Sequence, residues 1–388
     1  MRFGGNIVAV KNHNRQALLQ CLLDRPYSRV ELAGAVGISS MTVTNLVRDL
    51  LAEGWVEAVA TSAENNRPIG RPRKQLQLRS AAGYAIGIHI GIGTFRVALV
   101  DLTGVLIAAR DAQFVLGEPA SDTIAQFAAL ASDLLAEHGD VRGKLLGIGV
   151  GASGLVDSER GVNVIAPSLN WHNVPLASLL QTQLAAPVFV ENNVRAMALA
   201  EAYFGQARTV DSLAFVFGRI GVGAGFIMQR QLFRGIAAGA GEIGHTIIMP
   251  ENGRRCRCGQ RGCLETLVTE PVLLGEAYGR VSVEQFLDEG RGGSAEVLTR
   301  IDQLCTYLGI ALTNLVNTLN PEQIILGGLY AQGSDLFLPR LQTIIQQRAF
   351  GGLGKQVTLT TTSFNQNAGV IGAATLALVN NFYAKPLR

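Results

Sequence analysis

The chain has 388 residues, 48% of them hydrophobic and only 16% charged, and its formal net charge is +3. A chain of this length and composition can bury a large core in roughly two or three domains, which excludes an intrinsically disordered protein. No apolar run reaches the roughly 18 uncharged residues that span a bilayer, and the first residues lack a signal-peptide core, so we expect a cytoplasmic protein with no membrane partner.

The basic residues are concentrated at the N-terminus. Residues 1–80 contain 11 Lys and Arg against 6 Asp and Glu, a net charge of +5, whereas the remaining residues contain 22 against 24, a net charge of −2. A local excess of positive charge is typical of a segment that binds nucleic acid, because phosphates attract Lys and Arg. This segment is therefore expected to contain a nucleic-acid-binding element.

Three short helices are predicted in the basic segment. The first has its apolar residues on one face. The second begins with a capping box, Ser28 followed three residues later by Glu31, and Gly37 then supplies the sharp turn of a helix-turn-helix. The third carries a stripe of valine and leucine. The predicted helical segments are Asn14–Asp24, Ser28–Val36 and Ser39–Gly54.

The third helix also presents short polar side chains and an arginine away from its apolar stripe. Short polar groups at the start of a helix, followed by an arginine, suit contacts with base edges and phosphates in a major groove. The predicted stripe is Val43, Leu46, Val47, Leu50 and Leu51. The candidate DNA-binding residues of this helix are Ser40, Thr42, Thr44, Asn45 and Arg48.

A basic, proline-containing stretch follows the third helix. It predicts two strands around a wing, which completes a winged helix-turn-helix DNA-binding domain within residues 1–80. Proline holds the segment Gly70–Arg73 extended, and Arg71 and Arg73 are candidates for a narrow A·T minor groove. The same segment also fits a polar hinge to the next domain. The alternative for the whole region is an amphipathic three-helix cap whose charges are only solvated.

From Tyr84 onward, apolar strands that end in glycines alternate with helical stretches. An α/β nucleotide-binding fold places its ligands at the ends of such strands. We therefore expect residues 81–388 to form a two-lobed α/β domain of the actin-like ATPase type, with a ligand cleft near residues 190–265. The strand segments are Leu145–Val156, Pro187–Asn192, Ser212–Ile227 and Gln323–Gly328.

Three cysteines and a histidine lie close together in the second half of the chain. A Cys3His set forms a closed tetrahedral zinc site, in which the metal stabilises a loop and leaves no position for a catalytic water. Interleaved arginines are expected to keep the thiols deprotonated. The alternative is a group of reduced cysteines without a metal. The predicted ligands of a structural Zn²⁺ ion are His245, Cys256, Cys258 and Cys263.

Five glycine-rich or polar segments resemble motifs of a known protein family. They are Gly87–Asp101, Pro167–Leu176, Glu191–Gly205, Gly239–His245 and Cys256–Glu265. Together they resemble the ROK family, the group of repressors, open reading frames and sugar kinases. The chain is similar to the transcriptional repressors of that family over essentially its whole length. The resemblance implies the kinase-like, two-lobed fold and the same four metal ligands.

The resemblance also implies a monosaccharide site. In the kinases of the family, an Asn-Asp pair and two glutamates hold the sugar, and amide and carboxylate groups are suited to sugar hydroxyls. The alternative is that the corresponding residues are satisfied polar groups in glycine-rich turns. The implied sugar-binding residues are Ser168, Asn192, Asn193, Glu242, His245 and Glu265.

Three departures distinguish this chain from the kinases that it resembles. The catalytic base of the family is an aspartate, and here that position is Asn193, whose amide binds a hydroxyl but does not accept its proton. In the phosphate-binding hairpin, His89 replaces the aspartate that positions magnesium. A second phosphate segment carries Arg219 and Ile220 in place of a Gly-Thr-Gly pattern. We therefore predict that the protein is not an enzyme and does not require ATP.

These features predict a sugar-responsive transcription factor, a repressor of carbohydrate-utilisation genes whose kinase-like domain binds a monosaccharide without phosphorylating it. Its partners are then a double-stranded DNA operator and the sugar effector. Because helix-turn-helix proteins read two half-sites, a homodimer or a dimer of dimers is expected. Two alternatives are an ATP-dependent sugar kinase with an added DNA-binding domain, for which Glu191 is the nearest replacement base, and a repressor controlled by a partner protein.

Overall fold

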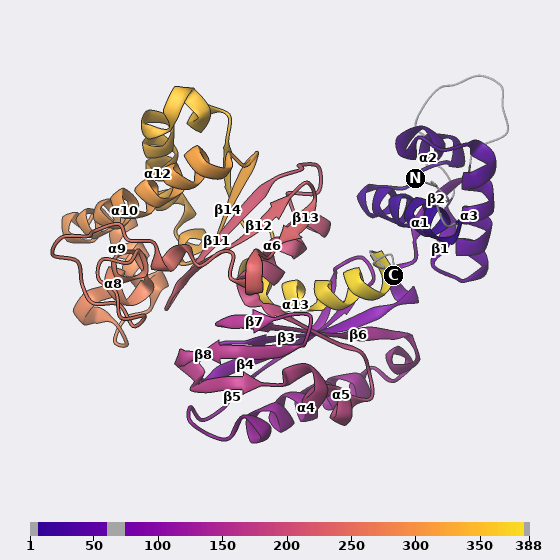
Figure 1. The fold of residues 1–388 in the computed structure, drawn as a ribbon, viewed down its shortest axis with the longest axis horizontal. Helices are drawn as coiled ribbons and strands as arrows, with labels where there is room; N and C mark the ends of the chain where they lie inside the picture. The colour runs from indigo at the N-terminus through magenta and orange to yellow at the C-terminus, as the bar shows by residue number, and fades with distance from the viewer. Residues whose placement is uncertain (1–6, 60–73, 384–388) are drawn as a thin grey trace. The chain divides into compact units, whose positions relative to one another are not determined.

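The computed structural model describes residues 7–59 and 74–383, and these fall into two compact units (Figure 1). The first unit comprises residues 1–191 with 373–388, and the second comprises residues 192–372. Each unit contains a five-stranded sheet and its own buried apolar cluster. The expected α/β class is therefore observed in both units.

Three helices lie at the start of the first unit, as the sequence predicts, and the capping box is present. The Ser28 hydroxyl accepts a hydrogen bond from the Glu31 N–H at 3.3 Å, and the Glu31 carboxylate accepts one from the Ser28 N–H at 2.7 Å. Gly37 follows with a left-handed backbone, φ 71°, which a side chain would strain. The helices are α1 (Ile7–Asp24), α2 (Arg29–Val36) and α3 (Ser40–Ala52), so α1 begins before the expected Asn14.

The apolar stripe of α3 packs the three helices together. Its buried residues are Val43, Leu46, Val47 and Leu50, whereas Leu51 is only half-buried. Ion pairs add to this packing on the surface, because Lys11 of α1 contacts Asp49 of α3 at 2.9 Å. The predicted wing strands are β1 (Val56–Val59) and β2 (Gln75–Leu78), which pair antiparallel.

The main sheet of the first unit has the strand order β10-β6-β3-β4-β5. Strand β4 pairs antiparallel with both β3 and β5, and β6 pairs parallel to β3. Apolar residues of two helices complete the core of this unit. The strands of this sheet are β3 (Tyr84–Ile90), β4 (Thr94–Asp101), β5 (Leu106–Gln113), β6 (Leu145–Ala152) and β10 (Val188–Asn192). The two helices are α4 (Ala120–Glu137) and α5 (Leu176–Leu184). A smaller sheet contains β7 (Leu155–Asp157), β8 (Val162–Ala166) and β9 (Trp171–Val174).

The sheet of the second unit, with the order β13-β12-β11-β14-β15, repeats this pattern. An antiparallel hairpin, β11–β12, has the parallel strand β14 beside it, as β3–β4 has β6. The strands are β11 (Leu213–Gly218), β12 (Val222–Met228), β13 (Gln231–Phe233), β14 (Gln323–Gly328) and β15 (Thr358–Thr361). The helices are α6 (Asn193–Tyr203), α7 (Glu265–Val268), α8 (Glu270–Leu274), α9 (Val283–Arg291), α10 (Ala295–Leu319), α11 (Leu329–Gln332) and α12 (Ser334–Arg348).

The C-terminal helix α13 (Ala368–Leu378) begins in the second unit and ends in the first. It lies so close to β6 that a Cβ atom on Gly149 would be 1.7 Å from the Ala373 carbonyl oxygen. A π-helical turn (Val379–Tyr383) follows it, and within the first unit the Phe382 ring lies 4.8 Å from the ring of Trp55. The π-helical turn therefore packs next to the start of the wing strand β1.

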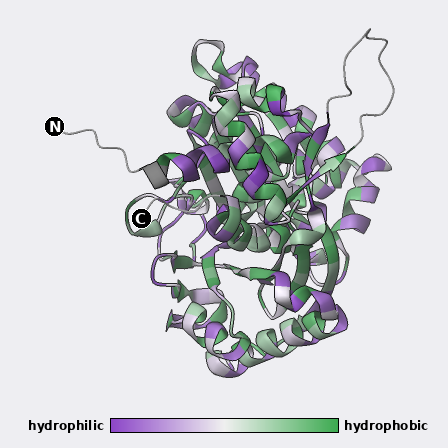
Figure 2. Ribbon diagram, turned by 90° about the vertical axis from the view of Figure 1, so that its right-hand side faces the viewer, coloured by the Kyte–Doolittle hydropathy of each residue, from purple (hydrophilic) through white to green (hydrophobic). Residues whose placement is uncertain are grey.

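The outer helices carry both hydrophilic and hydrophobic residues along their length (Figure 2), as expected for helices that cover a sheet on one side. Within the described residues, no single helix is long and apolar enough to cross a membrane; only α2 and α3 taken together pass such a test, and a 116° bend separates them.

Candidate functional site

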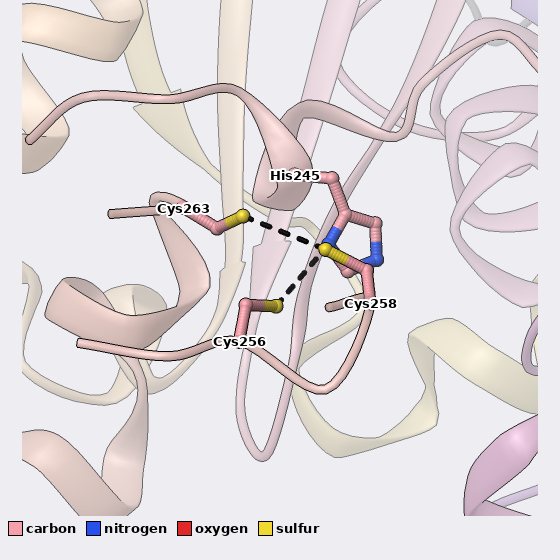
Figure 3. Close-up of side chains that lie close together, drawn as sticks. All are labelled: His245, Cys256, Cys258 and Cys263. Carbon is pink, nitrogen blue, oxygen red and sulfur yellow. Dashed lines mark hydrogen bonds between the residues drawn. The ribbon is translucent and has the colours of Figure 1, made fainter. Parts of the chain in front are cut away.

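Four side chains in the second unit converge on one point (Figure 3). His245 ends the short 3₁₀ turn Ile243–His245, and the cysteines lie in the loop that leads into α7. Every ligand atom of the set lies within 4.8 Å of the others. The predicted ligands His245, Cys256, Cys258 and Cys263 are therefore brought together.

Two of the distances between these atoms match those of a tetrahedral zinc site. With Zn–S bonds of about 2.3 Å and Zn–N bonds of about 2.0–2.1 Å, a tetrahedron separates two sulfurs by about 3.8 Å and a sulfur from a nitrogen by about 3.6 Å. The Sγ atoms of Cys258 and Cys263 are 3.7 Å apart, and Cys256 Sγ is 3.6 Å from His245 Nδ1. The cluster could hold a metal through Nδ1 of the histidine and three sulfurs.

Two of the three thiols of this cluster have raised pKa values, not the lowered ones that the sequence suggested. Burial, together with the Glu265 carboxylate, raises the pKa of the Cys256 thiol to about 12. Burial also raises the pKa of Cys263, whereas a hydrogen bond from the Gln260 backbone lowers that of Cys258. The expectation that arginines help to keep the thiols deprotonated is wrong for Cys256 and Cys263, because burial and the neighbouring Glu265 carboxylate both raise their pKa. A bound cation would have to displace their protons.

The loop that carries the cysteines is folded tightly on itself. Its two arms form isolated antiparallel bridges between Arg255 and Arg261 and between Ile247 and Cys263. Gly262 has φ 72°, and a Cβ atom there would be 1.8 Å from the Met249 carbonyl oxygen. Only glycine fits at this crossing, so the position is fixed by close approach of two backbone segments.

Two of the predicted sugar-binding residues lie beside the metal cluster. Glu265 is the first residue of α7, and its side chain is 11% exposed. One carboxylate oxygen accepts a hydrogen bond from Cys256 Sγ at 3.0 Å and lies 3.9 Å from His245 Nδ1. Glu242 is exposed and stands immediately before the Ile243–His245 turn, where its carbonyl accepts a hydrogen bond from the His245 N–H.

The two asparagines lie at the junction of β10 and α6. Asn192 caps α6, since its Oδ1 accepts hydrogen bonds from the N–H groups of Val194 at 3.0 Å and Arg195 at 3.2 Å. Asn193 is half-buried, and its Oδ1 accepts a hydrogen bond from the Val194 N–H at 2.9 Å. Ser168 lies in a 3₁₀ turn of the first unit, so its grouping with these residues stays a prediction.

The two kinase-like hairpins carry the residues that the sequence analysis singled out. His89 is in β3, where it pairs with Arg96 of β4, and the turn that follows includes Gly93 at φ 68°. In the second hairpin, the turn between β11 and β12 is closed by a hydrogen bond from the Arg219 N–H to the Gly221 carbonyl. The Arg219 guanidinium lies 3.8 Å from the Glu270 carboxylate.

The start of α3 presents most of the predicted DNA-binding side chains to solvent. Ser40, Thr44, Asn45 and Arg48 are exposed, and Thr42 is half-buried. Met41, which was not among the predicted residues, is also exposed, at 71%. Its place between Ser40 and Thr42, away from the apolar stripe, was the signal that the sequence offered. Arg71 and Arg73 lie outside the described residues.

A family model described as ROK family matches residues 85–380. The xylose repressor of Caldicellulosiruptor bescii is 30% identical over 96% of this chain and 97% of its own, and the DNA-binding transcriptional repressor Mlc of Escherichia coli is 26% identical over 95% and 94%. The glucokinase of Halalkalibacterium halodurans is 26% identical over 75% of this chain and 94% of its own.

Solved structures agree with these relatives. A ROK family transcriptional regulator, described as a homolog of the Escherichia coli MLC protein, superimposes with a TM-score of 0.82 and 25% identity, over 97% of this chain and 98% of its own. A ROK family glucokinase from Streptomyces griseus, solved with glucose and AMPPNP, superimposes with a TM-score of 0.65 and 26% identity, over 76% and 99%. The predicted kinase-like fold with a preceding helix-turn-helix is therefore confirmed.

Proposed function

The chain belongs to the ROK family, and from this premise we propose that it is a sugar-responsive transcriptional repressor of carbohydrate-utilisation genes. The observation that carries this proposal is the share of the chain that each kind of relative matches. Relatives named as repressors match 89–96% of the chain, whereas the glucokinase relative matches 75%. The family model itself begins only at residue 85, after the three helices and the wing.

The DNA-binding role belongs to α3 and the wing. The exposed hydroxyl, amide and guanidinium groups at the start of α3 can contact base edges and phosphates, and Met41 can contact a thymine methyl. The wing arginines Arg71 and Arg73 would add contacts in the minor groove. The operator is double-stranded DNA with two half-sites, and the protein acts as a homodimer or a dimer of dimers.

The sugar-binding role belongs to residues around the metal cluster and the start of α6. Carboxylates accept hydrogen bonds from sugar hydroxyls, and the asparagine amides both donate and accept them. His245 can serve two roles, because its Nδ1 faces the sulfurs and a metal bound there would leave the proton on Nε2, which can donate to a hydroxyl. The proposed sugar-binding residues are Ser168, Asn192, Asn193, Glu242, His245 and Glu265.

The metal of the proposed site is zinc in a structural role. Four protein ligands fill a tetrahedron, so no coordination position remains for water or substrate. When bound, the ion would crosslink the cysteine loop to the turn after Glu242 and so fix Glu242 relative to Glu265. Its contribution is therefore to the shape of the sugar site.

Phosphoryl transfer is not part of the proposal. Asn193 occupies the position of the family base, and His89 that of the carboxylate that positions magnesium, so both proton acceptance and metal positioning are lost. Glu191, the nearest replacement base, is fully buried at the end of β10. The proposed protein binds sugar without consuming ATP.

The test is calorimetry on the purified, zinc-loaded protein with common monosaccharides and their phosphates, with and without Mg-ATP, followed by operator binding with each sugar that binds. We expect a sugar that binds equally with and without ATP and changes operator affinity. Release of ADP with any sugar would instead establish a kinase. No heat with any sugar, together with tight operator binding, would favour control by a partner protein.

A further inference from the structure

Arg195 is the largest fully buried side chain among the described residues, with 1% of its surface exposed. A buried guanidinium is stabilised only when its N–H groups are hydrogen-bonded. One of its terminal nitrogens, Nη1, donates to the Ala238 carbonyl at 2.6 Å and to the Ala240 carbonyl at 3.2 Å. The side chain thus reaches from the first turn of α6 to a loop more than forty residues away in the sequence.

The loop that Arg195 binds has an unusual backbone. Ala237 and Ala238 have φ values of 51° and 52°, in the left-handed region that residues with a Cβ atom rarely adopt. Ile236, beside them, is 95% exposed, so apolar packing does not hold the loop in this shape. Left-handed residues persist where surrounding contacts over-determine them. The two hydrogen bonds from Arg195 are contacts of this kind.

This loop leads directly into Glu242. Gly241, at φ 98°, is pinned to β12, because its carbonyl accepts a hydrogen bond from the Ala224 N–H at 2.7 Å and a Cβ atom on it would be 2.0 Å from the Ala224 oxygen. The next residue of β12, Gly225, approaches α6 so closely that a Cβ atom there would be 2.9 Å from the Cα of Arg195. Helix, strand and loop are therefore in direct contact at this point.

Arg195 also touches the other half of the proposed sugar site. Its backbone N–H donates to Asn192 Oδ1 at 3.2 Å, in the cap that begins α6 next to Asn193. One residue thus bonds to Asn192 through its backbone and to the loop that leads to Glu242 through its side chain. We propose that Arg195 is a positioning residue for the sugar effector, which holds Glu242 at the separation from Asn193 that a monosaccharide requires. This role rests on the proposed function.

The test compares Arg195→Met with a matched control, Arg300→Met. Arg300 also donates from Nη1 to two carbonyls of a loop, those of Leu273 at 3.3 Å and Leu274 at 3.0 Å, next to a left-handed glycine at position 275. For the sugar that binds the wild-type protein, we expect Arg195→Met to lower affinity by about tenfold or more, Arg195→Lys to retain part of it, and Arg300→Met to leave it unchanged.

Two further measurements distinguish a loss of the positioning of Glu242 from a loss of folding. In a double-mutant cycle with Glu242→Gln, Arg195→Met is expected to cost little further affinity, since both changes act through the same carboxylate. Hydrogen exchange of the amides of residues 235–242 is expected to be faster in Arg195→Lys than in Arg300→Lys, a comparison that also serves if Arg195→Met does not fold.

The outcomes distinguish this role from the proposed function. A wild-type protein that binds no sugar contradicts the proposed function and this role with it. A wild-type protein that binds sugar, with a folded Arg195→Met that binds it equally well, contradicts the role of Arg195 alone. Additive losses in the double-mutant cycle would show that Arg195 does not act through Glu242.

Discussion

At the scale of single residues, the proposed site separates hydrogen bonding to a sugar from proton transfer. Asn193 differs from an aspartate by one amide group, which still binds a hydroxyl but no longer accepts its proton. Its neighbour Asn192 has a structural task, because its Oδ1 caps α6. The Glu242 side chain makes no capping hydrogen bond to the turn that follows it, and it is exposed. Glu242 is therefore the residue at which sugar binding can be removed with the least damage to the fold.

We predict that Glu242→Gln lowers the affinity for the sugar effector by about tenfold to a hundredfold, because a hydrogen bond to a charged group contributes ~1.5–3 kcal/mol. Titration calorimetry measures the affinity, and circular dichroism with zinc content confirms that the protein is folded. The matched control is Glu251→Gln, an exposed glutamate of the same unit. Equal affinities for wild type and Glu242→Gln would remove Glu242 from the sugar site.

The raised thiol pKa values lead to a second residue-level prediction. Cys256 and Cys263 are protonated at neutral pH without a metal, so zinc binding must release their protons. Zinc affinity should therefore fall as pH is lowered, by about tenfold per pH unit for each proton released. A zinc affinity that is the same at pH 6 and pH 8 would contradict thiolate ligation.

Zinc binding is tested with a variant of one proposed ligand, Cys256→Ser, and with a control variant outside the cluster, Cys305→Ala. We expect Cys256→Ser to lose zinc and to melt at a lower temperature, because the site has lost one of its four ligands. Cys305 is equally buried in the same unit but lies in α10 and outside the cluster, so its variant should keep the zinc content of wild type. Metal analysis after gel filtration measures both.

At the scale of elements, α6 makes hydrogen bonds to other parts of the second unit near both of its ends. Its first turn carries Asn193 and Arg195, and near its end the fully buried carboxylate of Glu201 accepts hydrogen bonds from the Thr362 hydroxyl at 2.6 Å and the Ser363 N–H at 2.9 Å. The segment with Thr362 and Ser363 leads into α13. A short helix therefore fixes two loops that are far apart in the sequence.

The start of α3 is the element on which DNA binding depends in the proposal. Arg48 is a charged side chain with 72% of its surface exposed, beside Asp49 at 3.6 Å. We predict that Arg48→Ala weakens binding to all DNA sequences to a similar extent and lowers the slope of log affinity against log salt by about one, as expected for the loss of one phosphate contact. Fluorescence anisotropy at several salt concentrations measures both quantities.

The control for this variant is Arg110→Ala, an arginine of the first unit that is paired with Glu137 on α4 and lies outside the three helices. Its salt slope should equal that of wild type. If Arg48→Ala relaxes the preference at one base position and leaves the salt slope unchanged, then Arg48 contacts a base edge instead of a phosphate.

At the scale of the whole molecule, α13 is, like β10, an element whose residues belong to both units. Beyond it, the Tyr383 hydroxyl donates to the Leu102 carbonyl at 2.6 Å, and Phe382 contacts Trp55 beside the wing strand β1. A sugar that binds in the second unit can change DNA binding only if it favours one of two states of the protein. The C-terminal segment provides a continuous chain connection through which such states can differ.

This coupling has a thermodynamic consequence that holds whether the sugar releases or promotes DNA binding. If the sugar changes operator affinity by a given factor, the operator must change sugar affinity by the same factor. We predict equal factors in two titrations: sugar into free and operator-bound protein, and operator into free and sugar-bound protein. Sugar binding that is tight but leaves operator affinity unchanged would contradict the assignment as an effector.

The sequence by itself determined the class of the fold, the capped helices and the four residues that could hold a metal, because these depend on local patterns. Ser28, Glu31 and Gly37 define their helix within ten residues, and Cys256, Cys258 and Cys263 are close in the chain before it folds. The tertiary structure decided what depends on burial and distant contact. Only folding raises the pKa of the Cys256 thiol, and only folding brings Arg195 to the carbonyls of Ala238 and Ala240, since burial and pairing across many residues leave no local signal in a sequence.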